Sequence, residues 1–165
     1  MEDKHEHSVT VEHWEKVYTG IREMVQFGEA KNGLLMGLNV AILYNVSAGA
    51  ISFASPRDGV LTVLALAGIL ASTLILLISL FPKFKNMGEV NPLFFGSVAN
   101  TKKEDYHKLC ANLTREELLR YYATQIHANS QIALRKFRDF RLAIACAVPS
   151  YLLFTLLYIL NKKGW

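Results

Sequence analysis

The sequence predicts an all-α integral membrane protein with three transmembrane helices and a helical cytoplasmic region. The chain contains three long apolar runs, each free of acidic, basic and histidine residues: 33–54, 60–81 and 142–160. Each run is close to the ~20 residues that a helix needs to cross a bilayer. A soluble helix of this length would be expected to carry charged side chains on its solvent-facing side. The apolar surface of these runs therefore belongs in lipid.

The distribution of charge predicts how the chain is oriented. The central segment, 82–141, carries 11 of the 18 basic residues, against six acidic residues. The connection between the first two spans carries only Arg57 and Asp58. Basic residues favour the cytoplasmic side of a membrane. We therefore expect a single multi-pass domain, 1–165, in the cell inner membrane, with the N-terminus and the central segment cytoplasmic and the C-terminus outside.

The N-terminal arm predicts an amphipathic cytoplasmic helix over 8–32, and Thr10 is a suitable cap for it. The apolar residues that follow at helical spacing are Val11, Trp14, Val17, Tyr18, Ile21, Met24, Val25 and Phe27. We expect the arm to pack on the central segment rather than lie on the membrane surface, because it carries more acidic than basic side chains. No proline interrupts the chain before the first span, so this helix is expected to run through the membrane boundary.

Small or polar residues recur at every fourth position of the first span: Gly33, Gly37, Ala41, Asn45 and Gly49. Positions four apart lie on one face of a helix, and glycines at this spacing let helices approach closely. The amides of Asn39 and Asn45 need partners in hydrocarbon. They either form hydrogen bonds between helices or face a water-filled path. Ser72 is a small polar position of the same kind in the second span.

Turn and cap signals divide the rest of the chain. Pro56 to Gly59 predicts a tight turn, which would make the first two spans an antiparallel hairpin. The segment 83–96 is expected to be irregular, because Gly88, Pro92 and Gly96 break regular structure. Two capping boxes follow, Thr101 to Glu104 and Thr114 to Glu117. The first is expected to open a short helix that ends near Ala111.

The second box is expected to open a long helix that continues into the third span until Pro149 bends it. Its contact positions alternate in steps of three and four, which is typical of a helix–helix contact. These positions are Leu119, Tyr122, Ile126, Asn129, Ala133, Phe137 and Phe140.

No set of catalytic residues emerges from the sequence. His5, His7 and His13 are a weak match to a metal site, and His107 and His127 have no nucleophile or ligand set beside them. The glycine patterns of nucleotide-binding loops are absent. We therefore predict a protein that is not an enzyme and that holds no cofactor or metal.

Basic residues directly before the third span are the best ligand candidates. They either anchor the chain to anionic lipid headgroups or bind the phosphate of a nucleotide or oligonucleotide, together with two arginines earlier in the same helix. The candidates are Arg115, Arg120, Arg135, Lys136, Arg138 and Arg141.

Several segments, taken in order, resemble the Pycsar-type transmembrane effectors of antiphage nucleotide-signalling systems. The stretch from Ile21 to Lys31 runs into Gly33-Leu-Leu-Met-Gly-Leu-Asn39, similar to the family's Phe-x-Asp-x-Lys-like stretch that small and leucine residues and an asparagine follow. The other segments are Leu80-Phe-Pro82, Asn91-Pro-Leu-Phe-Phe-Gly96 and Lys136-Phe-Arg138-Asp-Phe-Arg141. Glu29 stands where the family usually has Asp, and the sequence shows no cyclic-nucleotide-binding domain of the kind that many such effectors carry.

The resemblance implies a role in antiphage defence. A nucleotidyltransferase or cyclase encoded nearby would make a nucleotide or oligonucleotide second messenger that controls this protein. Activation would form a pore or otherwise disrupt the inner membrane, and so arrest growth or kill the cell.

We expect a homo-oligomer, most simply a tetramer, because three short-looped spans make a thin bundle with small-residue faces left over. The competing interpretation is a constitutive membrane scaffold or accessory subunit without pore activity. Solute transport is disfavoured, because the spans contain no ionisable residue.

Overall fold

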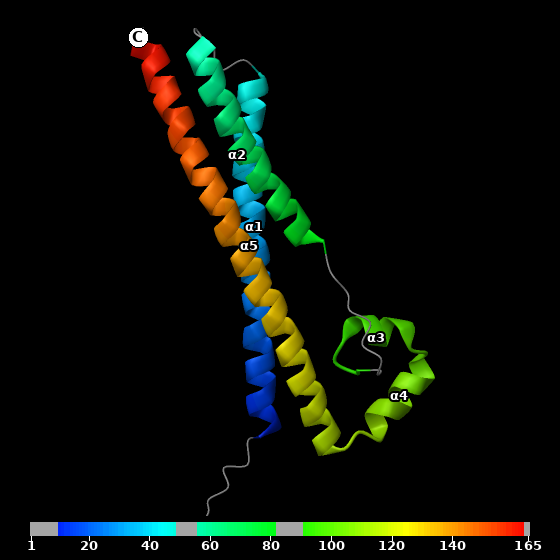
Figure 1. Ribbon diagram of the computed structural model, residues 1–165. Coiled ribbons are helices and arrows are strands. Elements are labelled where there is room, and N and C mark those ends of the chain that lie inside the picture. The colour runs from blue at the N-terminus through cyan, green and yellow to red at the C-terminus, as the bar shows by residue number, and fades with distance from the viewer. Residues whose placement is uncertain (1–9, 49–55, 82–90, 164–165) are drawn as a thin grey trace, which may run out of the picture. The chain divides into compact units, whose positions relative to one another are not determined.

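The computed structural model describes residues 10–48, 56–81 and 91–163 (Figure 1). No strand occurs in these ranges, so the predicted all-α class is confirmed. The described residues form five helices: α1 (Val11–Ser47), α2 (Pro56–Leu80), α3 (Phe95–Asn100), α4 (Lys103–Ala111) and α5 (Arg115–Lys163).

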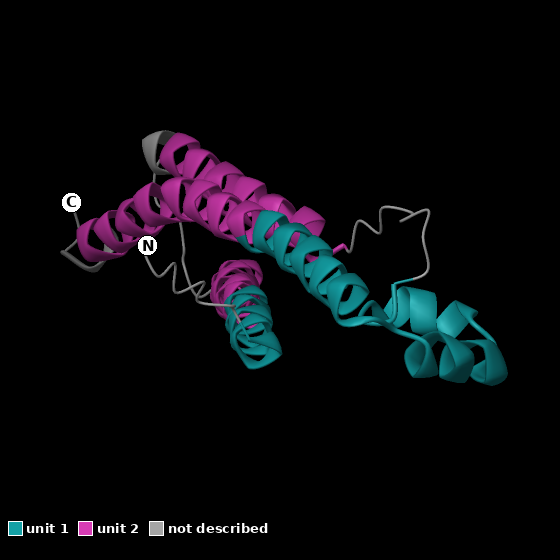
Figure 2. Ribbon diagram, turned by 90° about the horizontal axis from the view of Figure 1, so that it is seen from below, with its two compact units in different colours: residues 1–25, 83–133 teal, residues 26–82, 134–165 magenta. Residues whose placement is uncertain are grey.

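The chain divides into two compact units, coloured separately in Figure 2. Unit 1 comprises residues 1–25 and 83–133, and unit 2 comprises residues 26–82 and 134–165. Helices α1 and α5 contribute residues to both units, with lengths of 37 and 49 residues. Each of these two helices is continuous from the predicted extramembrane region into the adjacent apolar run, as expected.

Tyrosines join the segments of unit 1. The ring of Tyr18 packs edge-on against that of Tyr122, with ring centroids 5.7 Å apart, and its hydroxyl donates to the carbonyl of Leu93 at 3.4 Å. The Tyr106 hydroxyl donates to the carbonyl of Pro92, also at 3.4 Å. The N-terminal arm therefore packs on the central segment, as predicted.

The two predicted capping boxes have different outcomes. The backbone N–H of Thr114 donates to Glu117 Oε2 at 2.9 Å and that of Glu117 donates to Thr114 Oγ1 at 3.2 Å, so the second box is confirmed. The first box is wrong, because α4 begins after Lys102, which makes no side-chain capping bond. Thr101 lies one residue too early and ends α3 instead, with its hydroxyl donating to the carbonyl of Ser97 at 2.7 Å.

Two other local predictions change. The prediction of a tight turn from Pro56 to Gly59 is wrong, since α2 begins at Pro56. Proline suits the first position of a helix, where its missing N–H would have no helical partner. Helix α3 spans Gly96, which was expected to lie in irregular chain. Helix α5 continues through Pro149 without ending there, and the bend expected at this residue stays a prediction.

Polar contacts set the directions of the helices in unit 2. Asn32 of α1 bonds to Ser79 of α2, and Asn39 bonds to Ser72. The later residue of α1 thus bonds to the earlier residue of α2, so these two helices run antiparallel (Figure 1). Asn39 also accepts a hydrogen bond from Tyr151 of α5.

An apolar core lies further along the same three helices. Ala65, Ile69 and Phe154 are buried together, and partly buried side chains from all three helices pack around them: Ile42, Leu43, Val46, Leu66, Tyr151 and Leu153. Many large apolar side chains of α2 and α5 point outward instead. Leu70 and Leu152, for example, are 55% and 66% exposed.

Two helices in the described residues are long and apolar enough to cross a membrane, by length and composition: Gly59–Leu80 and Arg115–Leu160. They contain the second and third predicted spans, apart from Phe81. The first predicted span, 33–54, is not among them, and its last residues, 49–54, lie outside the described residues. A third span stays a prediction.

Candidate functional site

Four polar side chains meet in unit 2, and we call them the Lys136 cluster. Glu29 and Asn32 come from α1, Ser79 from the last turn of α2 and Lys136 from α5. Gly28 lies against Lys136, since a Cβ built at Gly28 would lie 3.2 Å from Lys136 Cβ. The absence of a side chain at Gly28 thus lets the lysine stem pass close to α1.

Lys136 contacts both neighbouring helices through its ammonium group. The side chain is only 10% exposed, and Nζ forms an ion pair with Glu29 Oε1 at 3.0 Å. Nζ also donates to the backbone carbonyl of Ser79 at 3.3 Å. The last carbonyls of a helix have no partner within it, and a positive charge is favourable beside them. Lys136 therefore caps α2 while it pairs with α1.

Asn32 leaves the cluster short of one hydrogen bond. Its side chain is fully buried, and Nδ2 donates to Ser79 Oγ at 3.2 Å. Its other polar atom, Oδ1, is a buried acceptor that has no hydrogen-bond partner in the described structure. An unsatisfied buried acceptor costs about 1–3 kcal/mol. The observed arrangement therefore does not satisfy every polar group that it buries.

Asn39 forms a second polar contact deeper in unit 2. Its Nδ2 donates to Ser72 Oγ at 3.0 Å, and its Oδ1 accepts a hydrogen bond from the Tyr151 hydroxyl. Asn39 and Ser72 are fully buried. Of the two interpretations open for Asn39, these contacts support hydrogen bonding between helices.

Three other packing candidates, Gly33, Gly37 and Asn45, lie on exposed parts of α1. Gly33 and Gly37 are exposed, and a Cβ built at either meets nothing within 4 Å. Asn45 is also exposed, and its Nδ2 donates to the Ala41 carbonyl of its own helix at 2.8 Å. Gly49 lies outside the described residues.

An aromatic cluster surrounds Lys31. Its Nζ lies 4.2 Å from the ring centroid of Phe27 and 5.6 and 5.7 Å from those of Phe137 and Phe140. An ammonium group within about 6 Å of a ring is attracted to the ring's face. The rings of Phe27 and Phe137 also contact each other, with centroids 6.3 Å apart.

The six basic ligand candidates occupy different environments. Lys136 is buried in its cluster, whereas Arg135, Arg138 and Arg141 are exposed in unit 2. Arg138 Nε lies 3.7 Å from Asp139 Oδ1, too far for a hydrogen bond. The other two candidates are exposed in unit 1, at Arg115 and Arg120.

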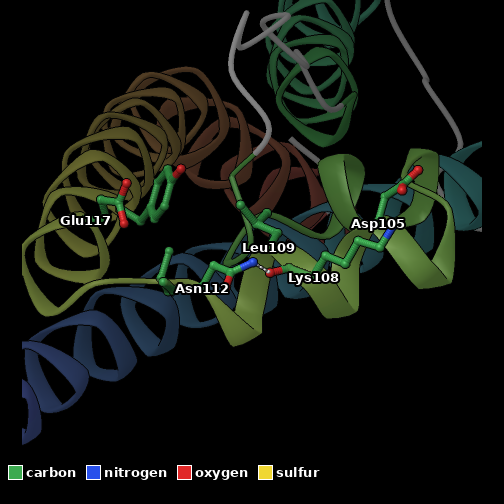
Figure 3. Close-up of a pocket in the computed structure, with 7 residues that line it drawn as sticks. Asp105, Lys108, Leu109, Asn112 and Glu117 are labelled. Atoms are coloured by element: carbon green, nitrogen blue, oxygen red, sulfur yellow. Dashed lines mark hydrogen bonds between the residues drawn. The ribbon is translucent and has the colours of Figure 1, made fainter.

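Unit 1 also has a pocket of about 340 Å³, shown in Figure 3. Two carboxylates and one ammonium group line it, so its charge is poorly suited to a phosphate. One of the carboxylates, Glu117, already accepts hydrogen bonds from the backbone and hydroxyl of Thr114, which hold the pKa of Glu117 below its ordinary value. The lining residues are Asp105, Lys108, Leu109, Asn112, Leu113, Glu117 and Tyr121.

The described residues contain no group of three or more histidine, cysteine, aspartate or glutamate side chains that could hold a metal ion. Of the N-terminal histidines, His13 is exposed on α1, and His5 and His7 lie outside the described residues.

A family model described as the Pycsar effector protein domain, PycTM, matches residues 13–161. The chain belongs to this family. It is similar to the Pycsar effector protein PtPycTM of Propioniciclava tarda, with 34% identity over 132 residues. That alignment covers 71% of this chain and 63% of the relative, so it spans less than two thirds of the relative's length. No solved structure matches the chain.

The resemblance expected from the sequence is thus confirmed. The PycTM family is one of effector proteins and not of enzymes, as predicted. The structure also gives a physical meaning to the motif that carries the resemblance. Phe27, Glu29 and Lys31 each contact a residue of α5, so in this chain the motif forms part of the contact between α1 and α5.

Sequence reasoning missed the pairing of Glu29 with Lys136 and the buried position of Asn32. One signal for Lys136 was available. It lies three residues after Ala133 and four before Phe140, and so on the face of the helix that was predicted to make a contact. Arg135 and Arg138, in the same stretch, do not share that face.

Proposed function

We propose that this chain is the membrane effector of an antiphage defence system that is controlled by a cyclic nucleotide. A neighbouring cyclase would make the signal, and the activated effector would disrupt the inner membrane and stop growth. Membership of the PycTM family carries this proposal. The relative in Propioniciclava tarda is itself described as a Pycsar effector protein.

The physical arrangement of unit 2 supports a membrane location. Asn39 and Ser72 are buried and paired inside the unit, whereas Leu70, Leu74 and Leu152 are more than half exposed. In lipid, buried polar groups need internal partners and apolar side chains can face outward. We propose three passes, with the N-terminus in the cytoplasm.

We propose that the protein acts as a homo-oligomer, with a tetramer as the simplest expectation, in which the exposed face of Gly33 and Gly37 contacts a second copy. A helix face without side chains allows the backbones of two helices to approach closely. The oligomer could open a pore or perturb the bilayer in another way. Either action would make the membrane permeable.

The orientation can be tested with single cysteines that are labelled from outside the cell. Cysteines that replace Asp58 and Lys163 should react with an impermeant reagent, and a cysteine that replaces Lys103 should not. Labelling of the Lys103 position from outside would overturn the proposed topology.

We propose that the exposed arginines Arg135, Arg138 and Arg141 bind the phosphate of the signal. The replacement Arg138→Gln removes one forked donor and leaves most of the attraction to lipid headgroups. A lipid anchor would lose about 1 kcal/mol, whereas a charged hydrogen bond to phosphate is worth roughly 1.5–3 kcal/mol. Normal membrane insertion together with a normal response to the signal would support the lipid-anchor interpretation instead.

The test of the whole proposal is membrane potential in cells that carry the effector with an active or an inactive cyclase. An effector should depolarise the cells only when the cyclase makes its product. A constitutive scaffold should leave the potential unchanged in both strains, and that result would overturn the proposal.

A further inference from the structure

The ion pair between Glu29 and Lys136 joins two helices just before the apolar run of each begins, at Gly33 and Leu142. We infer that this pair is a latch that holds the effector closed, and that the anionic signal activates the protein by drawing Lys136 away from Glu29. The inference rests on the proposed function and specifies how the site is regulated.

The first support is the position of the contact. The other two ion pairs in the described residues each lie within one helix, Glu12 with Lys16 and Arg138 with Asp139. The pair of Glu29 with Lys136 instead connects α1 to α5, and the same ammonium group binds the end of α2. A displacement of one side chain would therefore loosen three helices at once.

The second support is that the contact can be reached and exchanged. The Glu29 side chain is 52% exposed, so its carboxylate can be solvated when the pair breaks. Lys136 carries its charge on a flexible stem with three donors. An anion that approaches from the exposed Glu29 side of the contact would compete with Glu29 for this ammonium group.

The third support is the unsatisfied acceptor of Asn32. In the closed arrangement Asn32 Oδ1 is buried without a hydrogen-bond partner, while Nδ2 of the same amide donates to the Ser79 hydroxyl. A rearrangement that brings this oxygen to water or to a new donor removes that penalty. The closed state therefore contains an unfavourable contribution, which lowers the free-energy difference between it and an open state.

The test uses purified protein in lipid vesicles that contain a trapped dye, without any nucleotide. The replacement Glu29→Gln keeps the shape of the side chain and removes its charge, so dye release should rise about tenfold, the factor that ~1.4 kcal/mol would produce. Glu23→Gln is the matched control, because Glu23 is an exposed carboxylate on the same helix. It should release dye at the wild-type rate.

A second variant breaks the contact without changing a charge. At Gly28 an added side chain would press on the Lys136 stem, so Gly28→Val should also raise dye release. Gly20→Val is its control, since a Cβ at Gly20 meets nothing within 4 Å. The helix content of each variant is compared with that of the wild type.

The wild-type protein is then tested with each of the four 3′,5′-cyclic nucleoside monophosphates. Release by the wild type with a nucleotide, but no nucleotide-independent release by Glu29→Gln or Gly28→Val, would overturn the latch and leave the proposed function intact. No release by the wild type or by either variant under any condition would overturn both. Loss of folded protein in both variants would show a contact required in every state, which also excludes a latch.

Discussion

In unit 1 half-buried tyrosines donate the hydrogen bonds between distant segments, whereas in unit 2 two fully buried amides, Asn32 and Asn39, donate hydrogen bonds to serines of another helix. Tyr18 contacts Tyr122 and Leu93 with part of its surface in solvent. Asn39 and Ser72 contact each other with none. The same chain thus uses different side chains to connect its segments in the two units.

The surroundings that we propose, water for unit 1 and lipid for unit 2, would explain this difference. In water a tyrosine can bury its ring and leave its hydroxyl to water or to a carbonyl, so an imperfect bond costs little. In hydrocarbon no water replaces a missing partner, so polar groups must be paired inside. The hydrogen bonds of Asn32 and Asn39 in unit 2 should therefore be more sensitive to a single substitution than the tyrosine contacts of unit 1.

The largest effect is expected from Gly68→Leu in unit 2. A Cβ at Gly68 would overlap Ser150 Oγ and lie 3.1 Å from the Cys146 carbonyl oxygen. The added side chain must separate α2 from α5, so we expect a loss of about 3 kcal/mol in the free energy of unfolding. A denaturant titration in detergent micelles measures it.

Gly59→Leu is the control for this substitution, because a Cβ at Gly59 meets nothing within 4 Å. Its unfolding free energy should stay near that of the wild type. Equal stability of the two variants would show that α2 and α5 do not approach as closely as described.

The next effect tests the buried amide. Asn39→Leu removes the hydrogen bonds to Ser72 and Tyr151 and leaves both hydroxyls without this partner. Hydrogen bonds between helices in membranes are worth up to about 1–2 kcal/mol, so we expect a loss of that size. Asn45→Leu should cost less, because Asn45 is exposed and bonds only within its own helix. The reverse order would contradict the contrast between buried and exposed amides.

Local signals in the sequence predicted much of this fold. The chain from Thr114 to Leu142 contains no breaker, so the long helix α5 could be predicted, and so could its capping box. The same pattern at Thr101 failed, because that threonine already ends α3. A capping pattern therefore identifies a residue that can cap a helix. It does not tell whether that residue begins the following helix or ends the preceding one.

The contacts of the candidate site were harder to predict for a different reason. Glu29 and Lys136 are far apart in the sequence, and each also fits a solvated charge before a span. Their pairing depends on how closely α1 and α5 approach, which the missing side chain of Gly28 permits. The hydrogen bond of the Asn32 amide was equally hard to predict, since its partner Ser79 lies on another helix.

A smaller effect is expected in unit 1, from Thr114→Ala. This change removes the hydroxyl that caps α5, which should lower the free energy of unfolding by about 1 kcal/mol. Thr124→Ala is the control, because the Thr124 hydroxyl bonds only to the Arg120 carbonyl of its own helix. Circular dichroism during thermal unfolding measures both, and an equal loss in the two variants would exclude a capping role.

The same cap predicts a dependence on pH. Hydrogen bonds from the backbone and hydroxyl of Thr114 lower the pKa of Glu117 from its ordinary value of 4.5. The folded state then binds this proton less readily than the unfolded chain, so the contribution to stability is present above pH 4.5 and is lost as the pH falls through the lowered pKa. Thr114→Ala should reduce this loss on acidification. An unchanged pH profile would mean that other carboxylates control the acid response.

The smallest effect on the stability of the single chain is expected from Gly37→Leu. Because a Cβ at Gly37 meets nothing within 4 Å, the unfolding free energy should change by no more than about 0.5 kcal/mol. If this face contacts a second copy, however, the bulky side chain separates the two helices and weakens the oligomer. Mass measurement in mild detergent should then show smaller assemblies for Gly37→Leu than for the wild type. An unchanged assembly would remove this face from the subunit contact, whereas a large loss of stability would place a neighbour within the same chain against Gly37.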